Sequence, residues 1–266
     1  MLRRSAALVT VSFLLAISPA LPSLAADKFP KNCTPPYNGT AKHRDIDKTC
    51  GVEGSSPDGL TDAHKAQNRA KNNLCASGTP KKITFADLSE LQQDVDNDTS
   101  IHYGSSENLP DRTKLVNLST SDGTFSEGDV VVLEALVRAA KKGSKESCDC
   151  EKTKVLDTDI HVHLTETDGA DLCKSIVAEM IPHYRPDEWK WTNFRDMEHF
   201  PVRVTGQLFF DGSHKPCSGG AALSGHPARA TVWEIHPVYK FEVCEYDECD
   251  VPGVWATVAT WVKDYK

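Results

Sequence analysis

Two stretches in the second half of the chain alternate between apolar and polar side chains, and this alternation constrains the fold more than any other feature. In residues 200–211 the apolar positions are Val202, Val204, Leu208 and Phe210. In residues 229–244 the alternation places aromatic and aliphatic side chains opposite Glu, His and Lys. Successive side chains of a strand point to opposite faces, so both stretches predict strands with one buried face. The sequence therefore predicts a sheet or barrel with a polar face.

Other segments supply the remaining elements. Runs rich in β-branched residues predict strands at 129–138 and 155–164. Apolar residues at helical spacing predict helices at 61–74, from Thr84 to about Val95 and from Ala170 to Ile181, with a short one within 186–197. The tail beyond Cys244 fits a helix or a strand equally well.

The N-terminus has the pattern of a secretory leader. Two arginines precede an apolar core, and small residues follow at positions 23–26. We therefore expect a secreted or periplasmic protein with a signal peptide at 1–26, an extended arm and small helical region at 27–115, and a β-barrel-like domain at 127–266. No later run is long and apolar enough to predict a transmembrane segment in the mature chain.

The charge balance bears on partners. The formal net charge is −8, and it becomes −10 without the leader, which carries two arginines and no acid. Unspecific nucleic-acid binding needs a basic surface, so it is not expected. The partner is instead expected to be an unknown extracellular ligand.

All nine cysteines lie beyond the leader, at positions 33, 50, 75, 148, 150, 173, 217, 244 and 249. In an exported protein they are disulfide candidates: Cys33, Cys50, Cys75, Cys148, Cys150, Cys173, Cys217, Cys244 and Cys249. The first three are expected to pair partly among themselves. Because the number is odd, at least one thiol is expected to stay free or to pair between chains.

Residues that can bind ligands gather on the polar faces of the predicted strands. A ligand-binding face is expected from His161, His163, His214, Arg229, Glu234, His236 and Phe209. If the strands are neighbours, His161, His163 and His236 with Asp159 can hold a divalent metal ion such as zinc or manganese, because these ions accept imidazole and carboxylate ligands. The structural alternative is a solvent-facing sheet whose polar residues merely pair across strands.

The order of elements from 127 to 244 resembles the oligonucleotide/oligosaccharide-binding (OB) fold, a five-stranded Greek-key barrel. The resemblance implies an α+β fold with a helix between strands, preceded by the small disulfide-tethered helical region. Since only four strands are evident, the fifth is expected within 144–158 or 245–262. The fold family includes exported nucleases similar to staphylococcal nuclease, but no motif aligns Arg203 or Arg229 with their arginines.

Three functions follow as hypotheses. The first is an exported ligand-recognition protein that uses the polar His/Glu face. The second is a metal-dependent phosphodiesterase or nuclease-like hydrolase, in which Glu234 is a metal ligand or general base and Arg229 holds an anionic group. The third is a structural or interaction protein with no chemical site.

Overall fold

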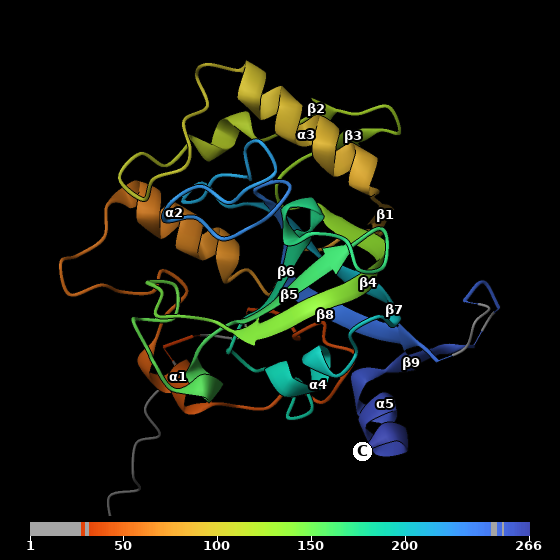
Figure 1. The fold of residues 1–266 in the computed structure, drawn as a ribbon. Coiled ribbons are helices and arrows are strands. Elements are labelled where there is room, and N and C mark those ends of the chain that lie inside the picture. The colour runs from red at the N-terminus through yellow and green to blue at the C-terminus, as the bar shows by residue number, and fades with distance from the viewer. Residues whose placement is uncertain (1–27, 30–31, 246–248, 252) are drawn as a thin grey trace, which may run out of the picture.

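Five strands close into a barrel in the computed structural model, which describes residues 28–29, 32–245, 249–251 and 253–266 (Figure 1). They are β4 (Val130–Lys142), β5 (Ile160–Thr165), β6 (Ile176–Met180), β7 (Pro201–Phe210) and β8 (Trp233–Cys244). The order is β4–β5–β6–β8–β7, and β7 pairs back onto β4. The β6–β8 contact is parallel and the other contacts are antiparallel. The expected α+β fold with an OB-like Greek-key barrel is confirmed.

The alternation of the strands explains why the barrel closes. Its core contains the apolar set of each strand, including Val162 of β5, Ala178 of β6, Val204 of β7 and Ile235 of β8, all fully buried. The intervening side chains point away from this core. Gly206 of β7 allows a close approach of β8, because a Cβ there would lie 2.4 Å from the carbonyl oxygen of Pro237.

The prediction of a helix from Ala170 to Ile181 is wrong. Leu172–Lys174 forms a single 3-10 turn, and β6 follows at once. The apolar positions 172, 176 and 180 fit a helix, but Ile176, Ala178 and Met180 also share one face of a strand. A short apolar run fits both the helical and the strand period. Here the pairing with β5 and β8 makes it a strand. The fifth barrel strand is therefore β6, and its expected place in 144–158 or 245–262 is also wrong.

Three helices join the barrel core. The predicted helix after Thr84 is α3 (Phe85–Asn97), whose N-terminus is capped reciprocally by Thr84 and Asp87. The short α4 (Trp191–Arg195) lies between β6 and β7, where the resemblance places a helix. The tail forms both β9 (Trp255–Thr257), paired with β8, and α5 (Val258–Tyr265). Buried side chains of all three helices belong to the same core.

The N-terminal region packs on the barrel (Figure 1). It contains α1 (Asp45–Thr49), α2 (Asp62–Lys71) and β1 (Lys81–Lys82), which adds to β4 in parallel. The stretch between α3 and β4 holds a 3-10 turn at Arg112–Lys114 and the hairpin β2 (Leu118–Ser119) and β3 (Thr124–Phe125). Another 3-10 turn, Val155–Asp157, precedes β5.

Four disulfides cross-link these parts, so the prediction of disulfides is confirmed. The pairs are Cys33–Cys75, Cys50–Cys150, Cys173–Cys217 and Cys244–Cys249. Cys148 is free and buried. Helices of the described residues are too short or too polar to cross a bilayer. The predicted leader falls outside the described residues.

Candidate metal centre

Six side chains with metal-binding atoms meet on the outer face of the barrel. His161 of β5, Glu179 of β6 and His236 of β8 point outward because their neighbours in each strand fill the core. Asp159 immediately precedes β5, and the loop between β4 and β5 adds Glu146 and Cys148. We call these six residues the donor cluster. Its members form three overlapping triplets, and within each triplet the three donor atoms lie within 4.8 Å of one another.

Glu179 stands in the middle of the donor cluster. One of its carboxylate oxygens lies 3.2 Å from Nδ1 of His161, and the other lies 3.0 Å from Nδ1 of His236. His161 in turn lies 3.5 Å from Glu146, and His236 lies 3.9 Å from Asp159. The Cys148 sulfur lies between Glu146 and Asp159, at 3.6 Å and 4.0 Å from their carboxylate oxygens.

Several of these close atoms lack hydrogen bonds. Among the described residues, Nε2 of His236 and Oδ1 of Asp159 are buried without a hydrogen bond. Nε2 of His161 and Oε2 of Glu179 also lack one and make only the ion-pair contacts described above. Buried polar atoms are almost always satisfied. Two donors bound to one ion at about 2.0–2.2 Å lie roughly 3.0–3.6 Å apart, which matches the close contacts here. A shared cation satisfies such atoms without hydrogen bonds.

Gly143 keeps space open beside the donor cluster. A Cβ at this position would lie 3.1 Å from Nε2 of His161 and 2.8 Å from the carbonyl oxygen of Asp159. That carbonyl already accepts a hydrogen bond from the Gly143 N–H at 2.6 Å, so it is not free to move away. Any side chain at 143 would therefore crowd the unpartnered imidazole nitrogen.

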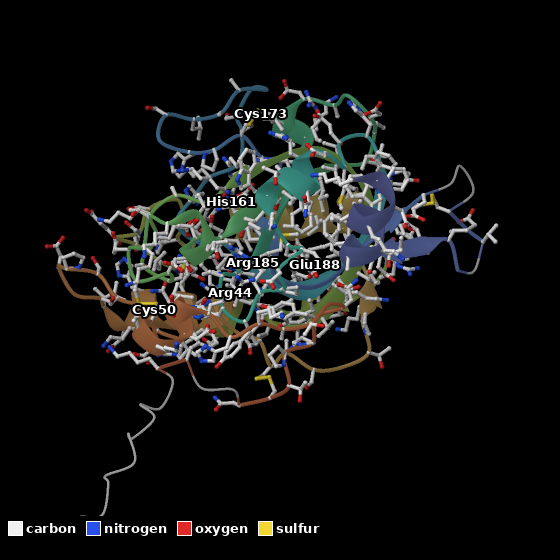
Figure 2. The ribbon with its side chains drawn as sticks, turned by 90° about the horizontal axis from the view of Figure 1, so that it is seen from below. Arg44, Cys50, His161, Cys173, Arg185 and Glu188 are labelled. Atoms are coloured by element: carbon white, nitrogen blue, oxygen red, sulfur yellow. A yellow bond between two sulfur atoms is a disulfide. The ribbon has the colours of Figure 1, made fainter. Side chains whose placement is uncertain are left out.

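The N-terminal region holds the loop that carries Glu146 and Cys148. Nζ of Lys71, at the end of α2, pairs with Glu146 at 2.7 Å, and the Asn72 amide donates to the Cys148 carbonyl at 3.0 Å. The Cys50–Cys150 disulfide anchors the same loop. Figure 2 marks His161 on the barrel and Cys50 in the N-terminal segment. All six residues of the donor cluster thus belong to the barrel and its β4–β5 loop, and the N-terminal region holds that loop in place.

A second layer of charged residues orients His236. Its Nδ1 hydrogen-bonds a carboxylate oxygen of Glu234 at 3.5 Å. The guanidinium of Arg229 pairs with the other oxygen of Glu234 and with Asp211 at 3.1 Å. Asp211 also pairs with His214. A carboxylate behind an imidazole fixes the direction of its second nitrogen, as it does behind many metal-binding histidines.

The electrostatics favour a cation in the donor cluster. Burial lowers the pKa of His236, but Glu179 and its neighbours outweigh burial and raise the pKa to about 10. Burial raises the pKa of Asp159 to about 7 against the opposing effect of His236. For Glu146, burial is outweighed by Lys71, which holds the pKa at about 2. Without a metal, protonated imidazoles balance the carboxylates, and a divalent ion can take over that role.

The thiol of Cys148 behaves differently. Burial raises its pKa well above the ordinary value, with nearby Asp149 adding to the effect. Cys148 is therefore a neutral thiol in the metal-free protein. A bound metal ion stabilises the thiolate and allows sulfur to act as a ligand.

The structure places the residues predicted from the sequence in three groups. Asp159, His161 and His236 lie in the donor cluster. Arg229, Glu234 and His214 lie in the second layer, where Arg229 and Glu234 are almost fully buried. His163 and Phe209 belong to neither group.

His163 faces Ser175, 3.0 Å from its hydroxyl oxygen, and burial lowers the pKa of His163 to about 3. It therefore takes no part in the metal triplets found among the described residues. Phe209 is fully buried, and its ring packs near His236 and under the Arg112 guanidinium, 4.9 Å from the ring centre. It offers no exposed surface for a base or sugar to stack on.

Sequence reasoning missed Glu146 and Glu179, and it placed Cys148 among the disulfide candidates rather than in the site. Glu179 was hidden by the wrong helix, because a strand period would have placed it opposite Ile176, Ala178 and Met180 and beside the histidines. Cys148 shares the Cys148-Asp-Cys150 triplet with a disulfide-bonded cysteine, and the spacing gives no sign of which one stays free. Glu146 lies in a turn without periodicity, so only the fold reveals it.

Comparisons with known proteins give no family. No protein-family model matches the chain, and no curated protein matches it. Among solved structures, a putative aspartyl-tRNA synthetase from Leishmania major Friedlin shares 14% identity, with 71% of this chain and 27% of that chain covered. The TM-score of 0.28 is too low for this likeness to carry an argument.

Proposed function

We propose that this protein binds a divalent transition-metal ion in the donor cluster, and that the ion is the ligand of its polar His/Glu face. The observation that carries the proposal is that the donors gather in close triplets whose buried atoms lack hydrogen bonds: Nε2 of His236 and Oδ1 of Asp159 have none, and Nε2 of His161 and Oε2 of Glu179 make ion-pair contacts only. Leaving such atoms unsatisfied is costly, and an ion bound within one of these triplets can satisfy the atoms of that triplet. The burial of Glu234, His236 and Arg229 favours a small ligand over a macromolecular one.

The donor set narrows the choice of ion. Two imidazoles, three carboxylates and one thiol combine nitrogen, oxygen and sulfur atoms. Calcium and magnesium prefer oxygen ligands alone, whereas zinc, iron and manganese accept imidazole. The thiol of Cys148 favours zinc over manganese because thiolates prefer softer ions. Zinc is therefore the first ion to test.

The test is metal analysis of purified protein after loading with zinc and removal of the excess. The wild type is expected to retain zinc, and His161→Ala and His236→Ala are expected to lose most of it. His163→Ala is the matched control, since this histidine lies on the same face of β5 outside the donor cluster. Circular dichroism establishes that each variant is folded. Wild-type protein without bound metal would refute the proposal.

The second part of the proposal concerns the cellular compartment of the protein. We propose that the chain is exported, because its N-terminus has the pattern of a leader and disulfides persist mainly in oxidising compartments. Export explains the pairing of eight cysteines while Cys148 stays reduced under the N-terminal cover. Alkylation of the unfolded, unreduced protein should label one thiol.

A metal-dependent hydrolase is the second candidate, and one observation favours it. His161 and Glu146 keep 13% and 21% of their side-chain surface exposed, so solvent and a substrate can approach the donor cluster from that side. Here Arg229 and Glu234 are positioning residues for His236, because both are buried away from that opening. A metal in such a site supplies a Lewis acid and an activated water. Assay of generic phosphodiester and phosphomonoester substrates with and without zinc tests this candidate.

A further inference from the structure

A pocket of about 420 Å³ lies between the end of β4, the loop that follows it and the start of β5. Lysines are the most frequent residues in its lining, which consists of Lys141, Lys142, Gly143, Ser144, Lys145, Thr153, Thr158 and His161. We call it the lysine pocket. Three lysines thus line one pocket in a chain whose formal charge is −8. A lysine-rich pocket on an acidic protein is a candidate site for anions.

Two of the three lysines are free to bind a ligand. Lys145 pairs with Glu151 at 2.7 Å. Lys141 and Lys142 are exposed, and no carboxylate of the described residues lies within ion-pair distance of either. Their ammonium groups carry three donors each and no acceptor, so they match the oxygens of an oxyanion. The side chains of Ser144 and Thr153 add hydroxyl donors at the rim.

The pocket reaches the donor cluster. His161 both lines the pocket and belongs to the donor cluster. His161 and Glu146 are the most exposed members of the cluster, because the other four are at most 2% exposed. Gly143 lines the pocket directly beside Nε2 of His161. An anion in the pocket therefore lies beside the candidate metal position.

We infer that the lysine pocket binds a phosphate-type oxyanion beside the metal ion, and so supplies the substrate-binding half of the site. This inference deepens the proposed function and rests on it. A divalent ion bound in the donor cluster places concentrated positive charge beside the pocket, and this charge attracts an anion. Metal and anion are therefore expected to strengthen each other's binding, as thermodynamic linkage requires.

The test is calorimetric titration of inorganic phosphate into zinc-loaded and zinc-free protein. Zinc-loaded wild type is expected to bind phosphate at least about tenfold more tightly than the zinc-free form. Lys141→Ala/Lys142→Ala is expected to lose about tenfold or more in phosphate affinity, which corresponds to the loss of one charged hydrogen bond. The control is Lys190→Ala/Lys263→Ala, which removes two exposed lysines outside the pocket. Zinc content should be unchanged in both double variants.

The outcomes separate the two proposals. Zinc-loaded protein that does not bind phosphate, or binding that Lys141→Ala/Lys142→Ala leaves unchanged, overturns the inference while metal binding stands. If the wild type binds no zinc, the proposed function fails. Titration of phosphate into the zinc-free chain then tests whether the lysine pocket binds an oxyanion without a metal. Phosphate binding that depends on Lys141 and Lys142 would then support an oxyanion site in the pocket. No phosphate binding would overturn the inference.

Discussion

Replacing Glu179 by glutamine removes one charge from the middle of the donor cluster and changes almost nothing in shape. The side chain is 2% exposed, with its two oxygens 3.0 Å and 3.2 Å from the imidazoles of His236 and His161. Removing one partner of a buried ion pair costs about 3–5 kcal/mol, because the other charge loses its compensation. We expect Glu179→Gln to lower the free energy of unfolding of the metal-free protein by that amount.

Glu242→Gln is the matched control. Glu242 of β8 likewise lies between two cations, at 2.9 Å from Arg203 and 2.8 Å from Lys240, but both of these partners reach solvent. Glu242 itself is buried, but its two cations can turn to solvent when its charge is removed, so this substitution should cost less than Glu179→Gln.

The assay is denaturant unfolding with disulfides intact, followed by tryptophan fluorescence, first with a chelator and then with zinc. At a free zinc concentration about 100 times the Kd, the wild type should gain about 2.7 kcal/mol. Glu179→Gln should gain much less because it lacks the central ligand. If Glu179→Gln costs no more than Glu242→Gln and gains as much from zinc, the reasoning about the donor cluster is refuted.

Three further predictions concern the surroundings of the site. Burial lowers the pKa of His183, which hydrogen-bonds Asp47, so below about pH 6.5 the unfolded chain binds a proton that the folded chain refuses. His183 should therefore contribute a loss of stability of up to about 1.4 kcal/mol per pH unit as the pH falls, and the slope of His183→Gln should differ from that of the wild type by this contribution in unfolding measured from pH 7 to 5. The Cys50–Cys150 disulfide spans 100 residues, so Cys50→Ala/Cys150→Ala should cost about 4–5 kcal/mol in denaturant unfolding; a loss under 1 kcal/mol would contradict this. Gly143→Ala should cost about 1–3 kcal/mol through overpacking and weaken zinc binding, and unchanged zinc affinity would argue against an ion at Nε2 of His161.

The barrel was predictable from local alternation, but its fifth strand was not. Alternation over 200–211 and 229–244 is long enough to exclude a helix, and these stretches became β7 and β8. Residues 176–180 are only five long, and their apolar positions fit two periods. Pairing with β5 and β8 decides between them, and those contacts are distant in sequence. Such short strands are determined by tertiary contacts rather than by their own pattern.

The candidate site was predictable in part for the same reason. His161 and His236 share the outward face of strands whose inward faces are plainly apolar, so their convergence required only that the strands be close. His163 has the same position in the pattern, but the barrel carries it toward Ser175 and away from Glu179. The pattern also gave no sign that the N-terminal region covers this face, because α2 contacts it through polar residues such as Lys71 and Gln67 rather than an apolar stripe.

The most direct measurement is anomalous diffraction from crystals of the zinc-loaded protein, recorded on both sides of the zinc absorption edge. The account predicts an anomalous peak within about 2.0–2.3 Å of donor atoms from at least three residues, among them His161 or His236 and Glu179. A well-diffracting crystal with no peak in the donor cluster, or with zinc only at surface histidines such as His199, would contradict it.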